Sequence, residues 1–404
     1  MIPFSPPQIN EKAIAAVNEV LRSGWITTGP KTKLFEKNLS AYNGNPHTIC
    51  LNSATAGLEI MLRWFGVKEG DEVIVPAYTY CATANVVMHC GAKPVMVDTN
   101  PVDFTIDVQK IKNAITAKTK VIMPVDFAGY PCDYDAINTI VNDPEIKKLF
   151  HPENAEQKTL GRILVLSDAA HSVGAKYKGK HTGTCCDISV FSFHAVKNLV
   201  TAEGGAVALN LPAPFNNEEI YKYLCIKSLH GQNKDALAKT QVGAWRYDVI
   251  EPGFKCNMTD IMSAIGLVEL ERYDEEVLPR RKEICKMYSE ALGKYDWAQL
   301  PVFSNGETES CYHLYPLRIK NVKESQRDAI IQKIFEKQVS VNVHFIPLAM
   351  LSVYKNIGYN INDYPVAYDN YSREISLPVH LLLSNDNVDT VIHSVIKSVE
   401  EVLV

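Results

Sequence analysis

The sequence lacks the patterns that mark several common classes of protein. No two of its ten cysteines stand in a CxxC pair, which argues against a zinc ribbon or a thioredoxin-like motif. Ten cysteines in 404 residues are also too few for a disulfide scaffold. The chain has no GxxxxGKS or GxxxxGKT phosphate loop and no strand-linked GxGxxG. The motifs typical of P-loop NTPases and of Rossmann dinucleotide-binding enzymes are therefore absent, which argues against both classes.

The sequence also lacks an excess of positive charge. Lys and Arg number 41 and Asp and Glu number 46, which gives a formal net charge of −5. A general nucleic-acid binder would need a bulk positive field.

Residues 1–7 have neither the basic region nor the apolar run of a signal peptide. The longest stretch without charged side chains, residues 73–92, contains Pro76 and several hydroxyl groups, which suits a strand followed by a helix better than a membrane span. We expect a cytoplasmic protein with no nucleic-acid or membrane partner.

Short apolar strands alternate with helical patterns over the first 250 residues. This alternation is typical of a mostly parallel sheet covered by helices on both faces, which is an α/β fold. A length of 404 residues favours two domains, and we expect them at residues 1–250 and 251–404. The expected strands are 72–76, 94–98, 120–125, 163–168, 187–193, 205–209, 313–319 and 339–344. The expected helices are 11–23, 55–65, 260–292 with a break or kink at Pro279, 326–336 and 387–402. Residues 142–161 are expected to form a surface insertion.

Lys197 is the first residue whose position suggests chemistry. It follows a buried strand, in an apolar-flanked loop before the pair Gly204-Gly205. Burial lowers the pKa of a lysine, so that its neutral amine can attack a carbonyl and form a Schiff base. A loop lysine in water remains the alternative.

Three further segments carry weaker signals at strand ends. Asp168 follows an apolar strand, where a carboxylate can hold the proton of a pyridine nitrogen, although a helix N-cap is the commoner role. Small residues at 52–57 precede a helix whose N-terminus can bind phosphate, although they are also compatible with ordinary capping. Tyr78 and Tyr80 could stack on an aromatic ring, or could simply pack. Together these features meet the four demands of pyridoxal 5′-phosphate (PLP): an imine-forming amine, a partner for the ring nitrogen, a phosphate cradle and a stacking platform.

At these residues the chain resembles the DegT/DnrJ/EryC1/StrS family of PLP-dependent nucleotide-sugar aminotransferases, over nearly its whole length. The motif Ser192-Phe-His-Ala-Val-Lys-Asn, followed by Glu203-Gly-Gly, is highly specific to this family. Together with Trp25-Ile-Thr-Thr-Gly-Pro, it most resembles the UDP-4-amino-4-deoxy-L-arabinose–oxoglutarate aminotransferases and other 4-keto-sugar aminotransferases. The resemblance implies fold type I, the aspartate aminotransferase fold, with a mostly parallel seven-stranded sheet in the large domain and a smaller α+β domain at the C-terminus.

The resemblance also implies roles for individual residues. Lys197 is the expected Schiff-base lysine, Asp168 the partner of the ring nitrogen and His171 a neighbour of the ring, and these three form the expected catalytic set. The other expected cofactor-binding residues are Ala54, Thr55, Tyr80, Ser192 and Asn257. The expected substrate-binding residues are Trp25, Ile26, Thr27, His194 and His344, and no metal is expected. Asn257 resembles a residue that reaches the phosphate of the neighbouring subunit, which implies a homodimer with shared active sites.

The activity implied is transfer of an amino group from glutamate to a 4-keto sugar carried by UDP or dTDP, giving an amino sugar and 2-oxoglutarate. Relatives that dehydrate their substrates have histidine in place of the lysine, so Lys197 favours transamination. Two alternatives remain open. One is a 3-keto-sugar or cyclitol aminotransferase of the same family, and the other is a PLP-binding regulatory protein without turnover.

Overall fold

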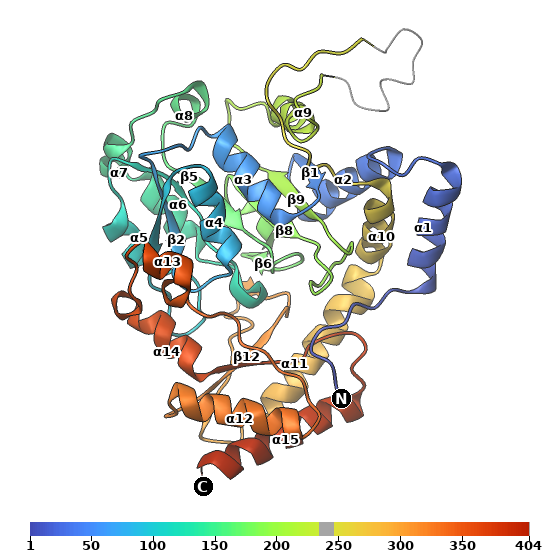
Figure 1. The fold of residues 1–404 in the computed structure, drawn as a ribbon, viewed down its shortest axis with the longest axis vertical. Coiled ribbons are helices and arrows are strands. Elements are labelled where there is room, and N and C mark those ends of the chain that lie inside the picture. The colour runs from blue at the N-terminus through green and yellow to red at the C-terminus, as the bar shows by residue number, and fades with distance from the viewer. Residues whose placement is uncertain (234–245, 404) are drawn as a thin grey trace.

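The computed structural model describes residues 1–233 and 246–403, and a seven-stranded sheet forms its centre (Figure 1). The strand order is β1-β9-β8-β5-β4-β2-β3. The pairs from β8 to β3 are parallel, whereas β9 is antiparallel to both of its neighbours. The strands are β1 (His47–Leu51), β2 (Glu72–Pro76), β3 (Lys93–Val97), β4 (Thr119–Ile122), β5 (Leu164–Asp168), β8 (Ile188–Ser192) and β9 (Gly205–Leu209). The expected mostly parallel seven-stranded sheet is confirmed.

Helices surround this sheet in the first part of the chain. Helix α1 begins after Asn10, whose side chain accepts from the Ala13 N–H, and ends at Gly24, which takes a positive φ of 72°. Glycine adopts that conformation without the steric penalty of a Cβ, so the sequence signal for this helix end was correct. The helices are α1 (Glu11–Ser23), α2 (Pro30–Asn43), α3 (Ala54–Trp64), α4 (Cys81–His89), α5 (Val108–Ala114), α6 (Tyr134–Asn142), α7 (Pro144–Leu149), α8 (Ala155–Leu160) and α9 (Asn217–Lys227).

A smaller antiparallel sheet, of order β10-β12-β13, lies below the central sheet in Figure 1, beside α11, α12 and α15. These elements bury a hydrophobic cluster of their own, which includes Leu317, Ile330 and Val391. The strands are β10 (Ala298–Gln299), β12 (Tyr315–Ile319) and β13 (Glu374–Leu377). The helices are α10 (Asp260–Glu271), α11 (Leu278–Leu292), α12 (Glu324–Glu336), α13 (Ser352–Asn356), α14 (Pro365–Arg373) and α15 (Asn385–Leu403). A third small sheet joins β11 (Thr308–Glu309), β6 (Lys176–Tyr177) and β7 (Lys180–His181).

One local expectation is corrected by the structure, and the break expected near Pro279 is confirmed. Residues 339–344 do not form a regular strand: Val339 and Asn342 make only isolated bridges. The reason is that the His344 N–H donates to the Glu374 carboxylate, at 3.0 Å, and not to a strand carbonyl. The helix expected over 260–292 is interrupted at Tyr273–Val277, which forms a π-helical turn. Pro279 lies just downstream, and its ring excludes a regular turn because it clashes with the carbonyl four residues earlier.

Residues 142–161 form two short helices, α7 and α8, which begin at the capping side chains of Asp143 and Asn154. The segment is anchored on the main body, because the buried Gln157 side chain donates to the Phe65 carbonyl at 2.8 Å. No helix among residues 1–233 and 246–403 is long and apolar enough to cross a membrane.

Candidate active site

Lys197 lies in a cavity of about 420 Å³ at the carboxyl ends of the central strands. It follows β8 and a short turn in which its N–H donates to the His194 carbonyl at 2.8 Å. Burial lowers the pKa of Lys197 from 10.5 to about 8, and the negative charge of Asp168 opposes part of that shift. A lysine with this pKa holds far more neutral amine near pH 7 than an ordinary lysine. Its environment therefore suits a nucleophile.

Asp168 faces the same cavity from the end of β5. Its Oδ2 accepts from the Thr83 hydroxyl at 2.7 Å, and its Oδ1 accepts from the Ala170 N–H at 3.3 Å. The Thr83 hydroxyl also lies 2.9 Å from that of Thr79. Burial raises the pKa of Asp168, while the Thr83 hydrogen bond and the charge of Lys197 oppose the rise. Burying a charged carboxylate raises the free energy of the fold unless a cationic group lies next to it. A protonated pyridine nitrogen would be such a cationic group.

The N-terminal end of α3 forms another wall of the cavity. Ser53, Ala54 and Thr55 line it, and the Ser53 hydroxyl caps the helix by accepting from the Ala56 N–H at 3.1 Å. The first N–H groups of a helix have no partner within it, and the first turn of α3 carries no acidic side chain. This end of the helix is therefore suited to a phosphate group.

Gly205 explains why the motif Glu-Gly-Gly accompanies the lysine. A Cβ built on Gly205 would lie 2.3 Å from the Ala54 nitrogen and 2.5 Å from the Ser53 carbonyl carbon. Any side chain would push the start of β9 away from the start of α3. Glycine at this position thus permits the close approach of backbone that shapes this wall of the cavity, which Ser192 also lines from the end of β8.

Three histidines line the cavity, and burial lowers the pKa of each. The shift is large for His171 and His313, where the positive charge of Lys197 adds to the effect, and the pKa of His344 falls to about 3. All three imidazoles are neutral at physiological pH. The His171 Nδ1 accepts from the Ala128 N–H at 3.3 Å, so its hydrogen is on Nε2. The centre of its ring lies 4.3 Å from that of His313.

The rim of the cavity holds more of the expected residues. Tyr80 lines the cavity and is 60 % exposed, with its ring centre 5.8 Å from that of Phe345. His194 also lines it, and its Nε2 lies 3.7 Å from a carboxylate oxygen of Glu203. These exposed rings leave room for a ligand at the mouth of the site.

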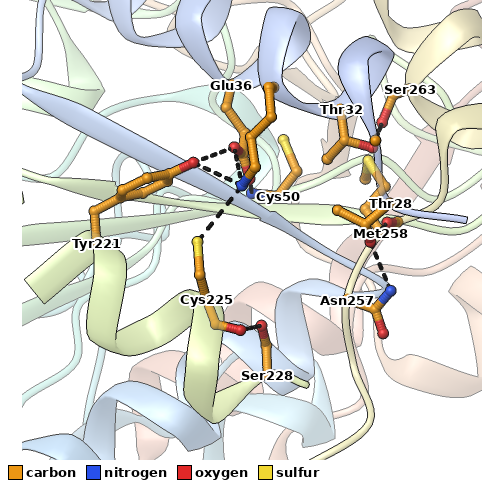
Figure 2. Close-up of polar contacts among 12 residues, drawn as sticks. Thr28, Thr32, Glu36, Cys50, Tyr221, Cys225, Ser228, Asn257, Met258 and Ser263 are labelled. Atoms are coloured by element: carbon orange, nitrogen blue, oxygen red, sulfur yellow. Dashed lines mark hydrogen bonds and ion pairs between the residues drawn. The ribbon is translucent and has the colours of Figure 1, made fainter. Parts of the chain in front are cut away.

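Asn257 and the residues Trp25–Thr27 do not line this cavity in the single chain. The Asn257 side chain donates to the Thr28 hydroxyl at 2.6 Å, as Figure 2 shows. Backbone contacts link the two segments as well, since the Asp260 N–H donates to the Thr27 carbonyl at 3.0 Å. Asn257, expected at a neighbouring subunit's phosphate, and the loop Trp25–Thr27, expected near the sugar nucleotide, therefore lie beside each other.

Sequence analysis missed four residues that shape the cavity or its support: Phe4, Thr83, His313 and Phe345. His313 was expected only as the first residue of the strand 313–319, whereas it is buried and its Nδ1 lies 2.8 Å from the Asn198 amide oxygen. Asn198 directly follows Lys197 in the sequence. A buried polar residue beside the lysine needs a polar partner, and this requirement was the sequence feature that could have pointed to His313. Nothing in the sequence placed Phe4 near the site, whereas Phe345 directly follows the expected substrate-binding residue His344.

Comparison with known proteins identifies the family. The model of the DegT/DnrJ/EryC1/StrS aminotransferase family matches residues 7–151 and 154–396. The chain belongs to this family. It is a PLP-dependent aminotransferase of fold type I, as the resemblance implied, and its cavity residues fit that cofactor.

Relatives from several bacteria support this assignment. Spr1654 from Streptococcus pneumoniae, described as a sugar aminotransferase, is 46 % identical with a TM-score of 0.96 in its PMP-form, and all of both chains is covered. The spore coat polysaccharide biosynthesis protein SpsC of Bacillus subtilis is 36 % identical over 98 % of this chain and 96 % of its own length. PseC of Helicobacter pylori, an aminotransferase involved in pseudoaminic acid biosynthesis, is 28 % identical with a TM-score of 0.85, and 99 % of each chain is covered.

The pKa of Lys197 leads to a pH-dependent prediction for the apoenzyme. The rate at which it captures PLP should rise with pH and level off above about 8, because the neutral amine is the nucleophile and Lys197 has a pKa of about 8. An ordinary lysine would still gain rate up to about pH 10.4. Stopped-flow absorbance of the visible band against pH measures this profile. A rate that keeps rising past pH 10 would contradict a lowered pKa.

Proposed function

We propose that the protein transfers an amino group from glutamate to the 4-keto group of a UDP- or dTDP-linked sugar. The product would be an amino sugar for polysaccharide, lipopolysaccharide or glycoconjugate synthesis in the cytoplasm. The observation that carries the proposal is the shared cavity of Lys197, Asp168 and the α3 N-terminus, in a chain that is 46 % identical to Spr1654 over its full length. The descriptions of SpsC, in spore coat polysaccharide biosynthesis, and of PseC, in pseudoaminic acid biosynthesis, support a biosynthetic role of this kind.

The proposed roles follow the geometry of the cavity. Bound PLP supplies an electron sink. Lys197 would hold the cofactor covalently, and its amine would serve as the base that removes the proton from the donor carbon and then as the acid that delivers this proton to the cofactor. Asp168 keeps the ring nitrogen protonated, and His171 lies beside the ring. Ala54, Thr55 and Ser192 hold the phosphate, and Tyr80 covers the ring.

We further propose a homodimer in which Asn257 of one subunit completes the phosphate site of the other. The contact between Asn257 and Thr28 supports this arrangement, because it puts the expected nucleotide-sugar loop, Trp25–Thr27, beside the same residue and outside the chain's own cavity. Residues 1–250 would form the PLP domain and residues 251–404 the smaller domain, with His194 and His344 on the substrate side of the site.

A half-reaction screen tests the proposed substrate. The enzyme is converted to its pyridoxamine form with glutamate and is then mixed with UDP- and dTDP-linked 4-keto sugars, 3-keto sugars and a cyclitol ketone. We expect the visible band to return with a 4-keto sugar nucleotide. Return of the band only with a 3-keto sugar or the cyclitol would overturn the assigned position. If none of the ketones restores the band, the proposed sugar function fails.

A further inference from the structure

The N-terminal segment of residues 2–8, here called the strap, borders the active-site cavity through Phe4 and Ser5 and is tied at both ends. At one end the Ile2 N–H donates to the Gln338 carbonyl at 2.8 Å, and the Ser340 N–H donates to the Ile2 carbonyl at 2.9 Å. At the other end the guanidinium of Arg272 donates to the Gln8 carbonyl at 2.8 Å and to the Gln8 side chain at 3.0 Å. With both ends held, the middle of the strap has a defined position.

The middle of the strap forms part of the cavity wall. Phe4 and Ser5 both line the cavity that holds Lys197. The Ser5 hydroxyl donates to the carbonyl of Val196, the residue before the lysine, at 3.3 Å. The Phe4 ring stacks on His344, with 5.5 Å between ring centres and 25° between planes. Phe4 therefore contributes aromatic surface to the cavity wall beside His344.

A chain of hydrogen bonds fixes the His344 ring against Phe4. The His344 Nδ1 lies 2.9 Å from the Ser376 hydroxyl, and that hydroxyl lies 2.5 Å from Oε1 of the buried Glu374. Oε2 of the same carboxylate accepts from the His344 N–H at 3.0 Å, and the Tyr78 hydroxyl donates to the His344 carbonyl at 2.5 Å. Because Nδ1 is engaged, Nε2 is the ring nitrogen left to bind a ligand.

The part of the cavity wall formed by Phe4 and His344 suits a ligand with a neutral, polar ring better than it suits an anion. Burial keeps His344 neutral, so the wall offers one hydrogen bond and an apolar aromatic surface. A pyranose matches both features, because its C–H groups can pack on an aromatic ring and its hydroxyls can hydrogen-bond an imidazole. Glutamate, which is acyclic and carries two carboxylates, has no comparable face.

We propose that the strap forms one wall of the sugar-binding pocket and that Phe4 is a specificity-determining residue, packing on the sugar ring while His344 Nε2 hydrogen-bonds a sugar hydroxyl. This inference rests on the proposed sugar function. It predicts that the strap acts in only one half of the reaction, namely the half in which the keto sugar is bound.

The test is Phe4→Ala in the full-length holoenzyme, with both half-reactions measured separately. We expect the KM for the 4-keto sugar nucleotide to rise about 10-fold, since the packing of a whole aromatic ring is lost. The glutamate half-reaction and the visible cofactor band should stay within about twofold of wild type. Phe4→Tyr keeps the ring and should restore the sugar KM to within about threefold. Ile9→Ala is the matched control, because Ile9 is 45 % exposed and does not line the cavity.

The outcomes distinguish this inference from the proposed function. If wild type accepts the sugar and Phe4→Ala accepts it equally well, the role of Phe4 is refuted while the sugar function stands. If Phe4→Ala weakens both half-reactions equally, the strap supports the fold and does not select the sugar. If wild type accepts none of the keto sugars, the sugar function and the role of the strap are both overturned.

Discussion

Lys197→Ala is expected to lower turnover by about 10⁴-fold, the upper end of what a general acid–base group contributes. The variant loses both the amine that binds the cofactor covalently and the group that moves the proton. Its fold should be no less stable, because alanine removes a lysine whose charged form is disfavoured by burial. Steady-state transamination and the visible absorption band measure the two losses, and thermal unfolding checks the fold.

Two further measurements test whether the loss of turnover is caused by the absence of the Lys197 amine. Added ethylamine should restore part of the activity of Lys197→Ala, because a small amine can occupy the space of the missing side chain. Lys222→Ala should retain full turnover, since Lys222 pairs with Glu218 on the surface of α9, outside the cavity. Full turnover by Lys197→Ala would refute the assignment of a Schiff-base lysine.

Asp168→Asn is expected to lower turnover by about 10²- to 10³-fold. Removing one member of a buried ion pair costs about 3–5 kcal/mol, and each 1.4 kcal/mol is about tenfold in rate. In the proposed holoenzyme the pair would be the Asp168 carboxylate and the protonated ring nitrogen, so the variant should weaken the electron sink while retaining Lys197. We expect kcat to fall far more than the apparent affinity for glutamate.

The apoenzyme of Asp168→Asn should be about as stable as wild type, because the removal of a buried charge offsets the loss of one of the two acceptor oxygens that face the Thr83 hydroxyl and the Ala170 N–H. Asp98→Asn is the control. Asp98 is also buried, but it accepts backbone N–H groups of α14 at a distance from the cavity. The control should lower the unfolding temperature and leave kcat unchanged. Equal losses of kcat in both variants would mean that Asp168 acts only on the fold.

The central strands were predictable because each is a short apolar run that ends in a polar or turn residue. The sheet buries both faces of β2, β4, β5 and β8, so their burial is nearly uniform along the strand and the apolar run is visible in the sequence. The edge strand β1 was missed, since His47 and Thr48 break its apolar pattern. Helix α2 was missed as well, although Gly44 ends it with a positive φ.

Residues 339–344 show where periodicity misleads. The alternation of valine with polar residues is typical of a strand, but strand pairing depends on a partner edge that the local sequence does not specify. The structure gives His344 a carboxylate partner instead, and this places its ring in the cavity. The deviation from a regular strand lies beside the active site, and functional sites are the places where sequence patterns most often fail to predict the local structure.

The sequence by itself determined the chemistry of this protein. A lysine, a carboxylate and the small residues before a helix each follow a strand, and strands of one sheet bring their ends together. The tertiary structure decided which other residues share that cavity. Phe4, Thr83, His313 and Phe345 come from distant parts of the chain, and Asn257 and Trp25 are held outside the cavity. Their places depend on packing between segments far apart in sequence, and no local pattern records such contacts.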